Sequence, residues 1–126
     1  MGGVKAEEID SVNAHGSSTP MNDAVETRAI KEVFGERAHE IPINATKSMT
    51  GHLLGAAGGL EGIICTMVCK EGKIPPTINF SDPDPTCDLD YAHDGMRVRP
   101  VRLALTNSFG FGGHNVCLAI RRWDGA

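Results

Sequence analysis

The sequence predicts a single domain of the α/β class. Short apolar segments of strand character alternate with longer segments of helical periodicity, in the order strand, helix, strand, helix, strand, strand. Glycine-rich or proline-rich stretches separate these segments, as turns and loops require. The length of 126 residues and the hydrophobic content of 40% suit one domain with its own core.

The first strand and the first helix precede residue 36. Ile9 to Ala14 is predicted to be a short strand that leads into a loop beginning at His15. Thr19 can cap the following helix, Pro20 suits its first position, and Gly35 can end it. The apolar face of this helix comprises Val25, Ala29, Ile30, Val33 and Phe34.

A second helix is predicted from Gly51 to about Lys70, after a short apolar strand at residues 41–45. This helix is apolar on nearly every side, which is typical of a helix with protein packed all around it. We therefore expect a central, buried helix rich in glycine and alanine. The small residues that would let neighbouring backbone approach closely are Gly55, Ala56, Ala57, Gly58, Gly59 and Gly62.

The last part of the chain is predicted to be a long loop followed by two strands. Residues 72–95 contain several prolines, which disfavour regular helix. Residues 102–107 alternate polar and apolar side chains, and residues 116–120 are largely apolar, so both are predicted strands. The glycine-rich segment 108–113 joins them.

Composition and charge exclude several classes of partner. The net charge is −4 and no run of lysine or arginine is present, so we expect neither a nucleic acid nor an anionic membrane as partner. The apolar run 53–69 is just below the usual length of a membrane span and is interrupted by Glu61, so we expect no membrane segment.

The cysteine pattern points to reduced thiols in the cytoplasm. The four cysteines form no CxxC pair and are too sparse for a secreted disulfide scaffold. Cys65 and Cys69 lie four residues apart without a second close pair, so we expect no metal site.

Three polar residues stand out because each lies where a strand or loop meets small residues: His15, Lys47 and His52. Each one alone would be unexceptional. If the second helix starts near Gly51, however, His52 lies in its first turn, where the helix dipole favours the neutral imidazole. A neutral imidazole that donates a hydrogen bond into a pocket can stabilise an oxyanion.

Glu61 is a carboxylate within the predicted apolar helix. A buried carboxylate without a partner would cost several kcal/mol or become protonated. Lys47 is therefore a plausible partner for Glu61, and a rim position facing water is the alternative. The segment from Phe109 to Gly113 could be a mobile gate or a tight connection between strands.

Several motifs together resemble the elongating β-ketoacyl-acyl-carrier-protein synthases, especially those of bacterial type II fatty acid synthesis. The resemblance covers nearly the whole chain in the family's order. The motifs are VNAHGSSTP at 12–20, KSMTGH at 47–52, PPTIN at 75–79, CDLDY at 87–91 and NSFGFGG at 107–113. The resemblance implies a thiolase-like fold of two similar α/β halves, of which residues 1–126 would be the C-terminal domain.

In this family an acyl thioester and a malonyl-carrier protein are joined by decarboxylative Claisen condensation. The resemblance implies that His15 and His52 hydrogen-bond the malonyl thioester oxygen and stabilise the enolate formed when the carboxylate leaves. It further implies that Lys47 orders the site with Glu61.

The resemblance also assigns residues to substrate binding and gating. The family's threonine pair near the phosphopantetheine arm corresponds to Ser17 and Thr19, and Ser17 departs from the usual threonine. The loop with Phe109 and Phe111 would gate the acyl pocket, and the Phe111 amide would contribute to an oxyanion hole. No other cofactor is expected beyond the arm on the carrier protein.

The implied partners are acyl carrier protein, bearing acyl and malonyl thioesters, and the N-terminal half with the nucleophilic cysteine, in a homodimeric family. None of the four cysteines here has the matching context, so we expect the chain alone to be inactive and to self-associate. Alternative functions are a non-catalytic domain that binds acyl chains or carrier protein, a fragment of an aromatic polyketide ketosynthase, and an assembly fragment without a ligand.

Overall fold

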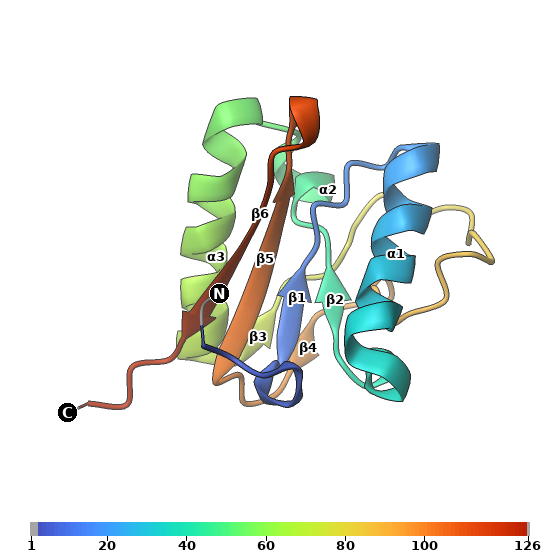
Figure 1. Cartoon of the computed structure of the whole chain (residues 1–126). Helices are drawn as coiled ribbons and strands as arrows, with labels where there is room; N and C mark the ends of the chain where they lie inside the picture. The colour runs from blue at the N-terminus through green and yellow to red at the C-terminus, as the bar shows by residue number, and fades with distance from the viewer. Residues whose placement is uncertain (1–2, 126) are drawn as a thin grey trace.

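The computed structural model describes residues 3–125 and places a mixed four-stranded sheet between two long helices (Figure 1). The strand order is β2-β1-β5-β6; β1 is parallel to β2 and β5, and β6 is antiparallel to β5. These strands are β1 (Ser11–Asn13), β2 (Ile43–Asn44), β5 (Leu103–Phe109) and β6 (Asn115–Arg121). A small separate antiparallel pair comprises β3 (Lys73–Ile74) and β4 (Arg97–Val98).

The helices cover opposite faces of the sheet. Helix α1 (Pro20–Phe34) lies on one face and helix α3 (Ala57–Glu71) on the other (Figure 1). Short helices connect the main elements: η1 (Ala6–Glu8), η2 (Gly35–His39), α2 (Lys47–Thr50), η3 (Leu54–Ala56) and η4 (Phe111–Gly113). The predicted α/β order of strands and helices is therefore confirmed.

Two apolar clusters hold the layers together. On the α1 side, Ile30 packs with strand residues such as Val12 and Ile43, all of them buried. On the α3 side, Cys65 and Val68 lie in the second cluster, which also contains Cys69, Ile74, Val101 and Ala104. Burial of this apolar surface is the main force that holds the sheet and helices together.

Helix α1 begins and ends where its local signals predict. Thr19 is its N-cap, with the Thr19 side chain accepting a hydrogen bond of 3.3 Å from the Asn22 amide, and Pro20 is the first helical residue. Gly35 follows the last residue with a φ of 57°, a conformation that glycine adopts without steric cost. The capping signals alone thus predict the whole extent of this helix.

Replacing Thr19 with alanine should destabilise the chain by about 1 kcal/mol, because the Asn22 amide loses its capping acceptor. Urea unfolding would measure this change. Thr66→Ala is a suitable control, since the exposed Thr66 hydroxyl only donates to the Gly62 carbonyl within α3. Equal stability of the Thr19 variant and the original chain would contradict the prediction.

The buried face of α1 differs from the predicted apolar face. Ile30 is buried, but Val25 and Val33 are 48% and 63% exposed. Glu26 and Thr27 are buried in their place. These polar side chains tolerate burial because hydrogen bonds satisfy them: Glu26 accepts from the His15 amide, and the Thr27 hydroxyl donates to the Asp23 carbonyl within α1.

The second helix departs from prediction at its start and in its burial. Helix α3 begins at Ala57, because Gly51 and Leu54 both have positive φ and interrupt the helical path. The helix is also buried on one side only: Ile63 and Met67 are 64% and 47% exposed. Within residues 3–125 the sheet covers one face of α3 and no element covers the other, so the expected burial on all sides is wrong for this chain.

Among the residues that the structure describes, no helix has the length and apolar character needed to cross a bilayer.

Candidate active site

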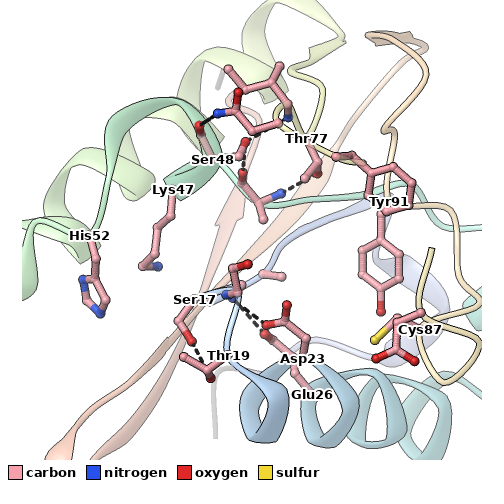
Figure 2. A pocket seen from close by; sticks show the side chains of 18 of the residues that line it. Ser17, Thr19, Asp23, Glu26, Lys47, Ser48, His52, Thr77, Cys87 and Tyr91 are labelled. Atoms are coloured by element: carbon pink, nitrogen blue, oxygen red, sulfur yellow. Dashed lines mark hydrogen bonds between the residues drawn. The ribbon is translucent and has the colours of Figure 1, made fainter. Parts of the chain in front are cut away.

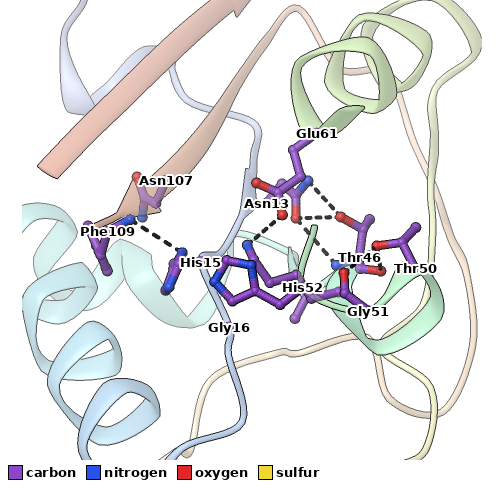
Figure 3. A network of polar contacts seen from close by, with 12 residues as sticks. Asn13, His15, Gly16, Thr46, Thr50, Gly51, His52, Glu61, Asn107 and Phe109 are labelled. Atoms are coloured by element: carbon purple, nitrogen blue, oxygen red, sulfur yellow. Dashed lines mark hydrogen bonds and ion pairs between the residues drawn. The ribbon is translucent and has the colours of Figure 1, made fainter. Parts of the chain in front are cut away.

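The predicted polar residues meet at one edge of the sheet. Strands β1, β2 and β5 are mutually parallel, so their carboxyl ends lie at the same edge. His15 follows β1, Lys47 begins α2 shortly after β2, and Phe109 ends β5. His52 lies in the loop between α2 and η3 and faces His15 (Figure 3).

The His15 ring is held by the end of β5. His15 is 7% exposed, and its Nδ1 atom accepts a hydrogen bond of 3.3 Å from the Phe109 backbone N–H. The Phe109 ring lies 5.3 Å from the imidazole centroid. Because Nδ1 is an acceptor, the hydrogen of the neutral ring lies on Nε2, which is left to donate.

The His52 ring is held in the same way by a different segment. Its Nδ1 atom accepts a hydrogen bond of 3.1 Å from the Leu54 backbone N–H. The neutral form of this ring therefore also carries its hydrogen on Nε2. The centroids of the two imidazoles are 5.4 Å apart, with the planes at 80°.

The helix-dipole effect predicted for His52 is absent, and other effects act on His15. His52 is not in the first turn of α3, so the helix-dipole argument for it is wrong. The structure supplies a different cause at His15, whose pKa is lowered by burial and by the Lys47 charge. The Glu26 and Asp23 carboxylates oppose this shift, and His52 adds to it.

This lowered pKa predicts a loss of stability on acidification. The folded chain binds a proton at His15 less readily than the unfolded chain, in which histidine titrates near the ordinary value of 6.5. The contribution of His15 to stability is therefore complete above that pH and falls as the pH drops through 6.5 towards the lower pKa of the folded state.

Urea unfolding measured between about pH 7.5 and about pH 5.5 would test this expectation. The His15→Gln variant should show a weaker loss of stability over that interval than the original chain. Identical slopes for the two proteins would show that another group causes the pH dependence.

Lys47 and Glu61 form a buried ion pair. The Lys47 Nζ atom lies 2.5 Å from Glu61 Oε1, and the two side chains are 4% and 3% exposed. This contact confirms the predicted pairing and excludes the rim position for Glu61. The second carboxylate oxygen, Oε2, has no hydrogen-bond partner among the described residues.

A buried polar network fixes α2 to the sheet. The Asn13 side-chain amide at the end of β1 donates to the Thr46 hydroxyl at 3.1 Å, and the Thr46 hydroxyl donates back to Asn13 Oδ1 at 3.2 Å (Figure 3). Thr46 immediately precedes α2 and Lys47. The network therefore fixes the position of the Lys47 backbone relative to β1.

A cavity of about 660 Å³ opens beside these residues (Figure 2). Lys47 and His52 line it together with Ser17 and Thr19, whose hydroxyls are 3.2 Å apart. The volume is in the range of small-molecule sites. Further lining residues come from the long loop after β3: Thr77, Ile78, Asn79 and Phe80.

The two predicted gate residues behave differently. Phe109 contacts the His15 ring, whereas Phe111 is 95% exposed on the turn between β5 and β6. Gly112 and Gly113 have positive φ in that turn. The segment is thus a strand connection in this structure, and the structure does not bring Phe111 to the histidines.

Glu26 was not predicted as a site residue, yet this buried α1 carboxylate accepts a hydrogen bond of 2.8 Å from the His15 backbone N–H. One signal could have found it, since Glu26 lies four residues before the buried Ile30 and shares its face. The structural requirement for Gly16 was also not predicted. A Cβ there would lie 2.5 Å from that of Ala45, so the tight turn requires glycine.

The sequence matches the family described as "Beta-ketoacyl synthase, C-terminal domain" over residues 1–81. A 3-oxoacyl-[acyl-carrier-protein] synthase 2 from Synechocystis sp. is 54% identical over 122 residues, which is 97% of this chain and 29% of the relative. The enzyme of the same name from Coxiella burnetii is 47% identical, with 95% and 29% covered. The chain thus spans less than a third of these curated relatives.

Solved ketosynthase structures have the same fold. A type II polyketide ketosynthase in complex with its acyl-carrier protein gives a TM-score of 0.92 at 42% identity, covering 96% of this chain and 30% of that chain. A β-ketoacyl synthase from Burkholderia phymatum gives 0.88 at 40% identity, covering 95% and 29%. The predicted half of a thiolase-like fold is therefore confirmed.

The comparisons agree with the motifs and with the fold. The family match covers more than half of the chain, and the relatives align along nearly all of it. The chain therefore belongs to the β-ketoacyl synthase family and represents its C-terminal domain.

Proposed function

We propose that this chain supplies the decarboxylating part of a β-ketoacyl-acyl-carrier-protein synthase active site. The observation that carries the proposal is the pair of imidazoles, 5.4 Å apart, with both Nδ1 atoms engaged by backbone N–H groups. Each ring is thereby left with an Nε2–H donor, and we propose that the two donors share one substrate oxygen. Such a pair suits an oxygen that becomes negative during the reaction.

The chemistry follows from these two donors. When a malonyl thioester loses carbon dioxide, the electron pair of the broken C–C bond forms an enolate with its charge on the thioester oxygen. Hydrogen bonds from His15 and His52 would stabilise that charge. The enolate carbon then attacks an acyl thioester, whose thiolate leaves, and the new C–C bond lengthens the chain.

The buried ion pair would help to keep the His15 imidazole neutral. Lys47 lines the cavity and pairs with Glu61. Burial of His15 and the Lys47 charge together lower the pKa of His15. A neutral imidazole donates without delivering its proton to the enolate. Lys47 and Glu61 would thus act by ordering the site.

We propose acyl carrier protein as the partner that delivers both thioesters. Its phosphopantetheine arm would lie in the cavity, which Ser17, Thr19 and His52 all line. Phe111 would act as a gate by moving inward from its exposed position. We expect the reaction to need no other cofactor and to take place in the cytoplasm.

We propose that the exposed side of α3 packs against the N-terminal part of a synthase, which would present the nucleophilic cysteine and the acyl group. Ile63 and Met67 lie on this side, and Leu53 and Leu54 just before the helix are also exposed. Without such a cover, these side chains should drive self-association. Analytical ultracentrifugation that shows a monomer at all concentrations would contradict this expectation.

Complementation would test the proposed function. The chain is mixed with the N-terminal part of a 3-oxoacyl-[acyl-carrier-protein] synthase 2, and condensation of acyl- and malonyl-carrier protein is assayed. We expect product from the mixture and none from either part alone. A folded complex without activity would favour the alternative of a non-catalytic domain that binds carrier protein or acyl chains.

A polyketide ketosynthase is the second candidate, supported by the structural match to a type II polyketide ketosynthase. The same assay separates the two candidates when a reductase and a dehydratase of fatty acid synthesis are omitted. A fatty acid synthase should stop after one condensation. Repeated extension to a poly-β-keto chain would favour the polyketide candidate.

A further inference from the structure

The Glu26 carboxylate accepts hydrogen bonds from several separate segments around the candidate site. It accepts from the His15 amide at 2.8 Å, from the Gly16 amide at 3.0 Å and from the Asn107 side chain at 3.0 Å. A fourth, longer bond of 3.3 Å comes from Asn22 on its own helix. Glu26 is 4% exposed, so these bonds replace water as its partners.

The Glu26 contacts connect the two segments that orient the His15 ring. His15 and Asn107 both donate to the same oxygen, Oε1, so Glu26 holds the end of β1 against β5. Phe109 follows Asn107 by two residues in β5, and its N–H donates to His15 Nδ1. The distance between that N–H and the imidazole therefore depends on the carboxylate.

Only a carboxylate satisfies this arrangement. Its two oxygens act purely as acceptors, and all four groups that face them are N–H donors. A carboxamide of the same shape would present its own N–H₂ to one pair of donors. The chemistry of the site thus explains why an acid is buried on α1.

We propose that Glu26 is a positioning residue that seats the His15 imidazole for enolate stabilisation, an assignment that rests on the proposed function. It acts through the backbone of His15 and through Asn107, and no contact with the substrate is required. Catalytic geometry is sensitive to such support, because a shift of about 1 Å in a reacting group can cost about 100-fold in rate.

The test compares Glu26→Gln with Thr27→Val. Thr27 is the next residue on α1 and is equally buried, but its hydroxyl pairs with Tyr91 and with the Asp23 carbonyl. Two readouts are measured on each variant: hydrogen exchange of the Phe109 amide in the chain itself, and malonyl-carrier-protein decarboxylation in the complemented synthase. Urea unfolding reports the stability of each variant.

We expect Glu26→Gln to speed exchange of the Phe109 amide about tenfold or more and to slow decarboxylation by a similar factor. Thr27→Val should change neither readout beyond its effect on stability. A Glu26→Gln variant that matches Thr27→Val in either readout would overturn the proposal. If Glu26→Gln fails to fold, Asn107→Ala must show both changes in the same direction, and unchanged values overturn the proposal.

The exchange measurement separates this proposal from the proposed function. If the unmodified complemented synthase does not decarboxylate malonyl-carrier protein, the proposed function fails. Exchange of the Phe109 amide in Glu26→Gln then still decides whether Glu26 seats His15.

Discussion

Replacing Lys47 with alanine is expected to destabilise the fold by about 3 to 5 kcal/mol. The substitution leaves Glu61 in a site where its side chain is 3% exposed and one of its oxygens already has no partner. An isolated buried carboxylate must stay charged at high cost or take up a proton. Urea unfolding near neutral pH would measure the loss.

Two controls distinguish the cost of leaving a buried charge without a partner from the cost of losing any ion pair. Lys31 pairs with Asp88 at the surface, where the side chains are 36% and 47% exposed, so Lys31→Ala should have a much smaller effect. The double variant Lys47→Met with Glu61→Leu removes both charges and should recover much of the stability. Equal effects of Lys47→Ala and Lys31→Ala would contradict the expected cost of the buried charge.

Replacing His52 with alanine should slow decarboxylation of malonyl-carrier protein about 100-fold to 1,000-fold in the complemented synthase. This is the usual cost of removing one donor from an oxyanion site. His15→Ala should cause a loss of the same order, since both rings present an Nε2–H donor. Release of labelled carbon dioxide in the absence of an acyl substrate would measure the step directly.

A surface histidine provides the control for this prediction. His39 is exposed at the end of η2 and does not line the cavity beside His52. His39→Ala should therefore leave the rate unchanged. The His52 variant must also keep the stability of the original chain, which its exposed position favours. A rate for His52→Ala within a fewfold of the original would show that His52 does not carry enolate stabilisation.

Local signals predicted the elements of the fold well where they act within a few residues. Thr19 and Pro20 at the start and Gly35 at the end predicted helix α1 to the residue. The cost of burying a charge similarly made Lys47 a plausible partner for Glu61, with a rim position as the alternative, and the structure shows the ion pair. Both predictions depend on physics that is the same in any fold.

Predictions that depend on the path of the backbone were less successful. The apolar sequence from Gly51 onwards is compatible with a helix. Positive φ values at Gly51 and Leu54 nevertheless prevent a regular helix before Ala57, where α3 begins. His52 was consequently assigned to a helix terminus, whereas a backbone N–H from Leu54 orients it. No local sequence pattern predicts the turn at residues 51–54.

The position of Glu26 illustrates contacts that only tertiary structure reveals. Its partners come from the loop after β1 and from β5, and the latter is 81 residues away in sequence. Periodicity places Glu26 on the buried face of α1 but does not identify what it meets there. The exposed apolar side of α3 is a second example, because we propose that a partner outside this chain covers it.

The most direct test of the account is the tautomer of each imidazole. Long-range ¹H–¹⁵N correlation on the histidine-labelled chain at about pH 8, where an ordinary imidazole is neutral, would show which nitrogen carries the hydrogen. We expect Nε2–H for both His15 and His52, because backbone N–H groups donate to both Nδ1 atoms. A hydrogen on Nδ1 of either ring would contradict the two-donor site and the enolate chemistry inferred from it.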